Sequence, residues 1–221
     1  MTDTSLHRRY RSQIDVWHFL VENRPELWSG TGTHARLVAL ALLIAVPPAV
    51  ALGVAAARRP RLAALAVGTA GVIFTVPSLA LFALLVAPLG LGTAPAVAAL
   101  ALYSVLPVLR NTVVGLGEVP ADVVEAARGM GMTEAQTLWR VRLPLALPVV
   151  VGGIRVAAVT AVGMATVAAL VAAGGLGEFV FAGLRAGDET EVLAATIVIA
   201  ALALTVDGTL ALVEGGLRRS R

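Results

Sequence analysis

The side chains that usually carry enzyme chemistry are scarce in this sequence. It has no cysteine, which excludes thiol catalysis, disulfides and cysteine-ligated metals. Its three histidines, His7, His18 and His34, all precede the first long apolar run, so they cannot form a metal cluster or a hydrolytic triad inside it. It also has no lysine, and a phosphate-cradling P-loop requires one. We therefore expect no catalytic residue, no metal site and no cofactor on this chain.

Two charged residues remain that could act inside apolar surroundings. Arg155 and Asp207 each interrupt a long run of apolar residues. A charge in such a setting is expensive unless an opposite charge compensates it. The sequence predicts that Arg155 and Asp207 form an ion pair with mainly a structural role and gating as a lesser one. Extension of Arg155 to the nearest polar surface is the alternative.

The composition explains what must position these residues. Hydrophobic residues make up 58% and charged residues 14% of the 221 residues, and the mean hydropathy is +0.86. This is far more apolar than a soluble domain needs, so the chain belongs in a lipid bilayer. We predict an all-α, polytopic membrane protein. Its five expected transmembrane helices are 37–56, 62–86, 94–109, 145–173 and 192–213.

Arginine placement predicts the orientation. The arginines cluster at 58–61, at 110–142 and at 218–221, that is, after the first, third and fifth expected spans. Short loops rich in arginine stay in the cytoplasm, so the C-terminus should be cytoplasmic and the N-terminus outside. The net charge of +3 then reflects topology, and we expect no nucleic acid partner. The expected regions are an extracytoplasmic segment at 1–33, a transmembrane domain at 34–216 and a cytoplasmic tail at 217–221.

The extracytoplasmic segment has apolar residues near helical spacing. These residues are Ile14, Trp17, Phe19, Leu20 and Val21. They predict either a short amphipathic helix at the membrane interface or a partly ordered tail.

This topology places the two intramembrane charges at similar depth. Arg155 follows the cytoplasmic Arg142 by thirteen residues, or about 20 Å of helix. Asp207 precedes Arg218 by eleven residues, or about 16 Å. An unpaired charge at such depth costs at least about 2.5 to 3.5 kcal/mol, which favours pairing.

The one long polar insert between spans, 118–144, carries local signals for two short helices joined by a turn. Pro120 suits a first helical turn, and Gly131 suits a left-handed C-terminal cap. Thr133 and Gln136 have the spacing of a capping box for the second helix. Pro144 follows where the chain must re-enter the membrane.

This insert resembles the EAA loop of ABC importer permeases. The segment EAARGMGMTEAQTLWRVRLP fits that pattern, with valine in place of isoleucine. The matching residues are Glu125, Ala126, Ala127, Gly131, Val141, Leu143 and Pro144.

The resemblance implies that the loop is a coupling helix that docks on an ATP-binding subunit. ATP and Mg would then be bound by that partner and not by this chain. Met130, Met132 and Trp139 are candidate apolar anchors at the interface, or they pack the hairpin against the membrane surface.

Three further segments resemble permeases for glycine betaine, carnitine and choline. They are TVPSLALFALL, ALYSVLPVLRNT and AGGLGEFVFAGL. The resemblance implies a type I importer permease in the cytoplasmic membrane of a bacterium, in contact with membrane lipid. Its partners would be two ATPase subunits, a second permease and an extracytoplasmic binding protein. The alternatives are a permease for methionine or another small solute, an ion-coupled secondary transporter, and a structural subunit.

The translocation path should use polar or polarizable residues inside the spans. The candidates are Ser78, Tyr103, Ser104, Thr160, Met164 and Thr166. Hydrogen bonds between helices explain each of them as an alternative. Aromatic residues make up only 5% of the chain, so an aromatic cage for tight binding is expected on the separate binding protein.

Overall fold

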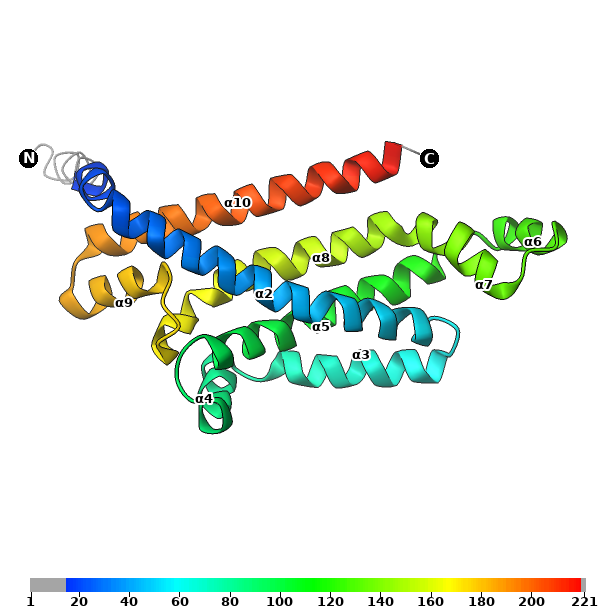
Figure 1. The fold of residues 1–221 in the computed structure, drawn as a ribbon, viewed down its shortest axis with the longest axis horizontal. Coiled ribbons are helices and arrows are strands. Elements are labelled where there is room, and N and C mark those ends of the chain that lie inside the picture. Colours follow the sequence, from blue (N-terminus) through cyan, green and yellow to red (C-terminus); the bar gives the residue numbers. More distant parts are fainter. Residues whose placement is uncertain (1–14, 220–221) are drawn as a thin grey trace, which may run out of the picture. The chain divides into compact units, whose positions relative to one another are not determined.

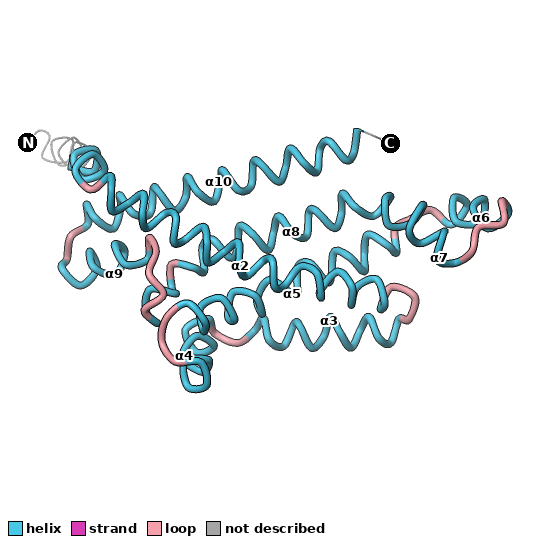
Figure 2. Tube along the Cα trace, in the orientation of Figure 1, coloured by secondary structure: helices cyan, strands magenta, loops and turns pink. Residues whose placement is uncertain are grey.

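The computed structural model describes residues 15–219, and over this range the chain is helical without strands (Figure 1). The helices are joined by short loops (Figure 2). After a helix at 15–22, the elements are α2 (Arg24–Ala56), α3 (Pro60–Thr75), α4 (Ser78–Leu89), α5 (Thr93–Gly117), α6 (Ala121–Gly129), α7 (Glu134–Thr137), α8 (Leu143–Ala165), α9 (Gly177–Ala186) and α10 (Glu189–Arg219).

Among residues 15–219, four helices are long and apolar enough to cross a bilayer. They are α2, α5, the continuous helix Glu134–Ala165 and α10. The pair α3 and α4 adds a fifth span if it is counted as one broken span. The all-helical membrane fold predicted from composition is therefore confirmed.

The predicted span 62–86 is not one straight helix, because the chain breaks between α3 and α4. The two helices are bent by 95° at the break. Pro77 has no backbone N–H and disfavours a helical conformation for the residue before it. Val76 is accordingly extended, with φ −63° and ψ 131°, and its carbonyl accepts a hydrogen bond from the hydroxyl of Tyr103.

The span predicted at 145–173 has different ends in the structure. It begins earlier, because α7 continues through Leu138–Arg142 into α8 without a break. It also ends earlier, at Ala165, where a tighter turn at Val167–Val171 leads to the left-handed Ala172. The first span likewise begins at Arg24, thirteen residues before its expected start at Leu37.

The segment that joins α7 to α8 is a widened helical turn. The N–H of Leu143 donates to the carbonyl of Leu138, five residues back. Pro144 comes next, and a proline ring crowds the preceding turn of a regular helix. A widened turn directly before Pro144 accommodates the ring, so the helix continues where the sequence predicted a re-entry point.

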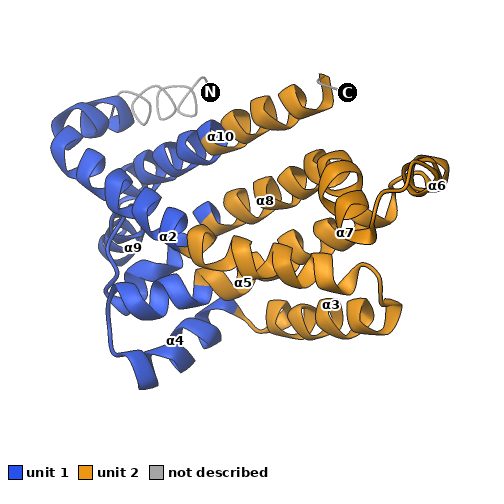
Figure 3. Ribbon diagram, turned by 45° about the vertical axis from the view of Figure 1, so that its right-hand side comes forward, with its two compact units in different colours: residues 1–40, 78–99, 162–205 blue, residues 41–77, 100–161, 206–221 orange. Residues whose placement is uncertain are grey.

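The described residues form two compact units (Figure 3). Within the described residues, unit 1 comprises 15–40, 78–99 and 162–205, and unit 2 comprises 41–77, 100–161 and 206–219. The helices α2, α5, α8 and α10 each contribute residues to both units.

Small side chains pack the helices of unit 2 closely. Ala49, Val108 and Ala157 belong to one buried cluster. A Cβ built on Gly153 would lie only 2.5 Å from the Cβ of Asn111, so α8 approaches α5 more closely than any larger residue permits. Such close approach replaces the hydrophobic driving force that helices lack in lipid.

A buried histidine connects α2 to α8 within unit 1. His34 of α2 is fully buried, and its Nε2 lies 2.8 Å from the carbonyl oxygen of Val162. Gly175, with φ +91°, packs against the same imidazole. Of the predicted interfacial segment, residues 15–22 are helical and Trp17 is exposed. Its location at the membrane interface stays a prediction, and His7, Ile14, and the arginines Arg8, Arg9, Arg11 and Arg221 lie outside the described residues.

Candidate functional site

The polar insert folds as the predicted hairpin, and its first helix ends with a glycine-dependent motif. Gly131 follows α6 with φ +79°. Its N–H donates to the carbonyl of Arg128 (2.9 Å), and the N–H of Met132 donates to the carbonyl of Ala127 (3.1 Å). These two bonds form a Schellman motif, which needs a left-handed residue at the position of Gly131.

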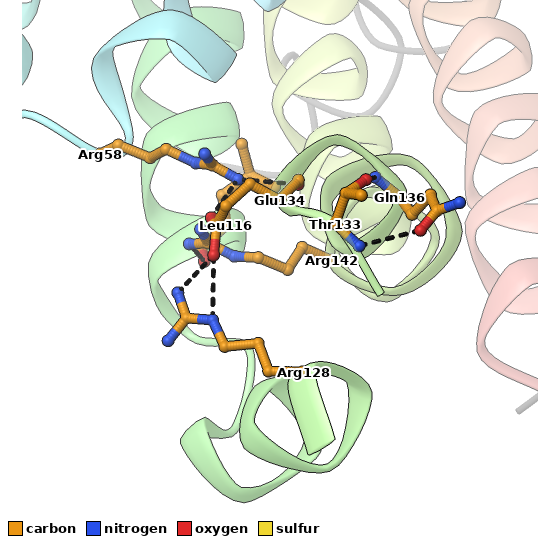
Figure 4. Close-up of polar contacts among 7 residues, drawn as sticks. All are labelled: Arg58, Leu116, Arg128, Thr133, Glu134, Gln136 and Arg142. Atoms are coloured by element: carbon orange, nitrogen blue, oxygen red, sulfur yellow. Dashed lines mark hydrogen bonds and ion pairs between the residues drawn. The ribbon is translucent and has the colours of Figure 1, made fainter. Parts of the chain in front are cut away.

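The second helix of the hairpin begins with the predicted capping box. The N–H of Gln136 donates to the hydroxyl of Thr133 (3.3 Å), and the amide oxygen of Gln136 accepts from the N–H of Thr133 (2.8 Å) (Figure 4). Two N–H groups that a helix start leaves free are thus satisfied. The turn, the end of α6 and the start of α7 therefore agree with the prediction from the sequence.

The structure adds an ionic brace around Glu134, which the sequence analysis missed. Arg58, from the loop between α2 and α3, lies 3.0 Å from Oε2 of Glu134 and donates to its backbone carbonyl (3.0 Å). Arg128 of α6 lies 2.9 Å from Oε1. Figure 4 shows both arginines reaching this one carboxylate. Glu134 therefore links α6 and α7 to the loop after α2.

A further arginine fixes the base of the hairpin. Arg142 donates from Nη2 to the carbonyl of Leu116 near the end of α5, at 2.8 Å (Figure 4). This carbonyl lies in the last turn of α5, where helix carbonyls lack partners within the helix. Glu134 thus anchors the hairpin to the loop after α2, and Arg142 anchors it to α5.

The residues matched to the EAA pattern differ in exposure. Glu125, Ala126 and Gly131 are exposed, whereas Ala127 is buried inside the hairpin. Ala127 therefore lies outside the exposed face of the hairpin, because α6 packs that side against its own chain. Val141 and Leu143 are half-buried, and Pro144 is exposed.

Two of the three candidate anchors stand out from the hairpin. Met130 is 72% and Trp139 is 63% exposed, while Met132 is half-buried. Large apolar side chains this exposed are typical of interaction surfaces.

The intramembrane charges are brought together. The Nε of Arg155 donates to Oδ1 of Asp207 (2.5 Å), and Nη2 donates to Oδ2 (2.7 Å). The structural role of this bidentate pair stays a prediction.

A third acid joins this pair, and the sequence analysis missed it. Oε2 of Glu214 lies 3.6 Å from Nη1 of Arg155, and Oε1 lies 2.8 Å from Nη2 of Arg218. Glu214 follows Asp207 by seven residues, or two helical turns, so both lie on one face of α10. That spacing was the signal that could have revealed it.

The candidate path residues fall into two groups. Tyr103 and Ser104 are buried, and their hydroxyls donate to backbone carbonyls, those of Val76 and Leu100. Their contacts are those of helix packing. Ser78, Thr160, Met164 and Thr166 are half-buried. Of the four, Thr160 lines a cavity of about 480 Å³ together with Arg155, Asp207 and Glu214.

Comparison with known proteins identifies the class. A family model for the binding-protein-dependent transport system inner membrane component matches residues 49–219. The chain therefore belongs to this family and is a multi-pass membrane permease subunit.

Individual relatives and solved structures are similar over most of the chain. The osmoprotectant import permease protein OsmW of Salmonella typhimurium is 42% identical over 88% of this chain and 93% of its own length. The glycine betaine/carnitine/choline transport system permease protein OpuCB of Bacillus subtilis is 37% identical, covering 89% and 90%. In fold, the chain is similar to the MetNI methionine ABC transporter in an inward-facing conformation, with a TM-score of 0.75, 20% identity, and coverage of 86% and 95%.

Proposed function

We propose that this chain is the permease of an ATP-driven importer for a quaternary-ammonium osmoprotectant, and that the α6–α7 hairpin couples it to an ATPase. The hairpin is the observation that carries the proposal. It is capped at its turn, braced by Glu134 and anchored by Arg142, and it presents Glu125, Met130 and Trp139 outward. An ion-coupled carrier has no need for such an element.

The proposal includes partners that hydrolyse ATP and capture the solute. The chain has no lysine and hence no P-loop, so ATP and Mg belong on a separate ATPase dimer. A second permease and an extracytoplasmic binding protein complete the importer. The proposed topology has the N-terminus outside and the C-terminus in the cytoplasm, because short loops rich in arginine stay in the cytoplasm.

The solute class rests on the relatives. Their names include osmoprotectant, glycine betaine, carnitine and choline, at 37% to 42% identity over most of the chain. These solutes share a quaternary ammonium group. The methionine transporter resembles this chain in fold alone, at 20% identity.

Reconstitution tests the proposal. The permease, its ATPase and its binding protein are placed in liposomes with ATP inside, and uptake of labelled glycine betaine is measured. We expect uptake that requires ATP and the ATPase, and that excess choline or carnitine competes more strongly than methionine.

Three outcomes would contradict parts of the proposal. Uptake without the ATPase, driven by a proton or sodium gradient, would identify a secondary transporter. ATP-dependent uptake of methionine alone would reject the solute class and keep the coupling. Unchanged cellular uptake after deletion of the chain would indicate a structural subunit.

A further inference from the structure

The cavity beside Arg155 has an unusual lining for a membrane-spanning segment. It lies entirely in unit 2, between α5, α8 and α10, and has a volume of about 480 Å³. Its polar lining residues are Asn111, Arg155, Thr160, Asp207 and Glu214. Binding sites for small molecules usually measure about 300 to 1,000 Å³. The cavity is therefore large enough for a small solute.

The charged groups are accessible from the cavity. The side chains of Arg155 and Asp207 are 35% and 34% exposed. A pair that serves only to lock two helices would be enclosed by its neighbours, whereas ionisable groups in spanning helices otherwise face water-filled cavities or solute pathways. The openness of this pair favours a cavity that admits water.

The residues that line the cavity carry more negative than positive charge. It has two carboxylates, Asp207 and Glu214, for one guanidinium. Glu214 is 3.6 Å from Arg155, which is too long for a strong hydrogen bond, and its shorter contact is with Arg218. A Cβ built on Gly152 would lie 3.9 Å from Oε2, which is van der Waals contact, so α8 leaves room for one methyl group beside this carboxylate. A methyl group of an ammonium can thus contact Glu214.

We infer that this cavity is a transient site on the translocation path for a quaternary-ammonium solute. The inference rests on the proposed function and names the groups that would recognise the solute. The ammonium group is held near Asp207 and Glu214. The carboxylate of a zwitterion such as glycine betaine replaces Asp207 on the guanidinium of Arg155, which accepts carboxylates in a bidentate manner. Choline has no carboxylate and uses the acidic side alone.

The absence of cysteine permits a direct test of the cavity's charge. A single Thr160→Cys substitution is made in the assembled transporter, and its reaction with two water-soluble thiol reagents is followed, trimethylammonium-ethyl and sulfonatoethyl methanethiosulfonate. We expect the cationic reagent to react faster, glycine betaine to slow it, and Glu214→Gln to abolish the difference between reagents.

Leu212→Cys on α10 is the matched control, because Leu212 is exposed but does not line the cavity. Its reaction should be insensitive to glycine betaine and to Glu214→Gln. If Thr160→Cys reacts only after denaturation, another subunit covers the cavity, and the inference is overturned. Equal rates for the two reagents would overturn it as well.

A second experiment measures selectivity. Arg155→Lys keeps the positive charge but loses the bidentate geometry. We expect the maximal rate of glycine betaine uptake to fall about tenfold relative to that of choline, which corresponds to about 1.4 kcal/mol. Arg219→Lys, on α10 and outside the cavity, should leave the ratio unchanged.

The two experiments separate this inference from the proposed function. A purely structural Arg155 would lower both uptake rates alike, and that result would reject the inference while the proposed function stands. If the unmodified transporter carries neither solute, the proposed function fails. The thiol reagents still report the charge of the cavity in that case.

Discussion

Two charged clusters of unit 2 use the same chemistry in different surroundings. At the hairpin, one carboxylate, Glu134, is shared by two arginines, and the three side chains are 39% to 56% exposed. Between α8 and α10, one arginine is shared by two carboxylates, and the exposure falls to between 15% and 35%. The contact distances overlap, so geometry alone does not rank the clusters.

The two clusters differ in what it costs to leave one of their charges unpaired. An exposed ion pair contributes about 0 to 1 kcal/mol, because water solvates each charge when the pair is broken. A charge left unpaired within a spanning helix costs at least about 2.5 to 3.5 kcal/mol. The hairpin cluster therefore positions a loop, whereas the cluster on the spans affects whether the helices assemble at all.

The largest expected effect is charge reversal within the spans. Arg155→Asp or Asp207→Arg alone should each strongly reduce the amount of folded protein, because like charges would face each other. The double variant should recover a substantial part of it. Recovery should be incomplete, since Glu214 would then lie beside a carboxylate at position 155.

Size-exclusion chromatography of the detergent-solubilised protein measures this recovery. Arg219→Asp on α10 is the control, and we expect a normal yield from it. If the double variant folds no better than the single ones, the ion pair does not contribute to assembly.

The next effect concerns the hairpin turn. Gly131 has φ +79°, which a β-branched residue adopts only with strain, of the order of 1 to 3 kcal/mol. Gly131→Val should therefore distort the Schellman motif and abolish solute-stimulated ATP hydrolysis, while the protein still inserts into the membrane. ATPase assays on the reconstituted complex check this.

Gly129→Val is the matched control for the turn. Gly129 is the last residue of α6, has open space around it and lacks a positive φ. We expect it to retain most of the stimulation. Full stimulation in both Gly131→Val and Glu125→Ala would reject the coupling role of the hairpin.

A smaller effect is expected at the ionic brace. Glu134→Gln should lower the free energy of unfolding by less than about 1 kcal/mol, and high salt should reduce the difference from the unmodified protein. The melting temperature at low and high salt measures both. Glu118→Gln, an exposed acid outside the brace, serves as the control. A loss as large as that in the Asp207 variants would refute the ranking of the clusters.

The smallest effect on stability belongs to the exposed apolar residues. Met130→Ala and Trp139→Ala should change the free energy of unfolding of the isolated permease by no more than about 0.5 kcal/mol, because both side chains are exposed. Their affinity for the ATPase should nevertheless fall. If thermal melting shows a clear destabilisation instead, these side chains pack the hairpin and are not anchors.

Most of the helical architecture could be predicted from the sequence. The apolar runs, the Schellman glycine Gly131 and the capping box at Thr133 all depend on residues within one or two turns, and the structure has them. The same locality explains two errors. The apolar run 62–86 predicted one span, whereas the chain bends by 95° at Pro77, and Pro144 predicted a re-entry point where a widened turn lets the helix continue.

The remaining features depend on contacts between residues far apart in the chain, and only some of these contacts could be predicted from the sequence. Depth arithmetic was enough to place Arg155 opposite Asp207, because the bilayer fixes the height of each spanning residue. The bilayer does not fix the positions of residues in the hairpin, and it does not fix the rotation of a helix about its own axis. The contact of Arg58 with Glu134, the burial of Ala127 and the approach of Glu214 to Arg155 therefore depend on how the helices pack. The apolar runs alone identify the charges that must be compensated inside the membrane. The packing of the helices sets which neighbours share these charges and leaves an open cavity beside them.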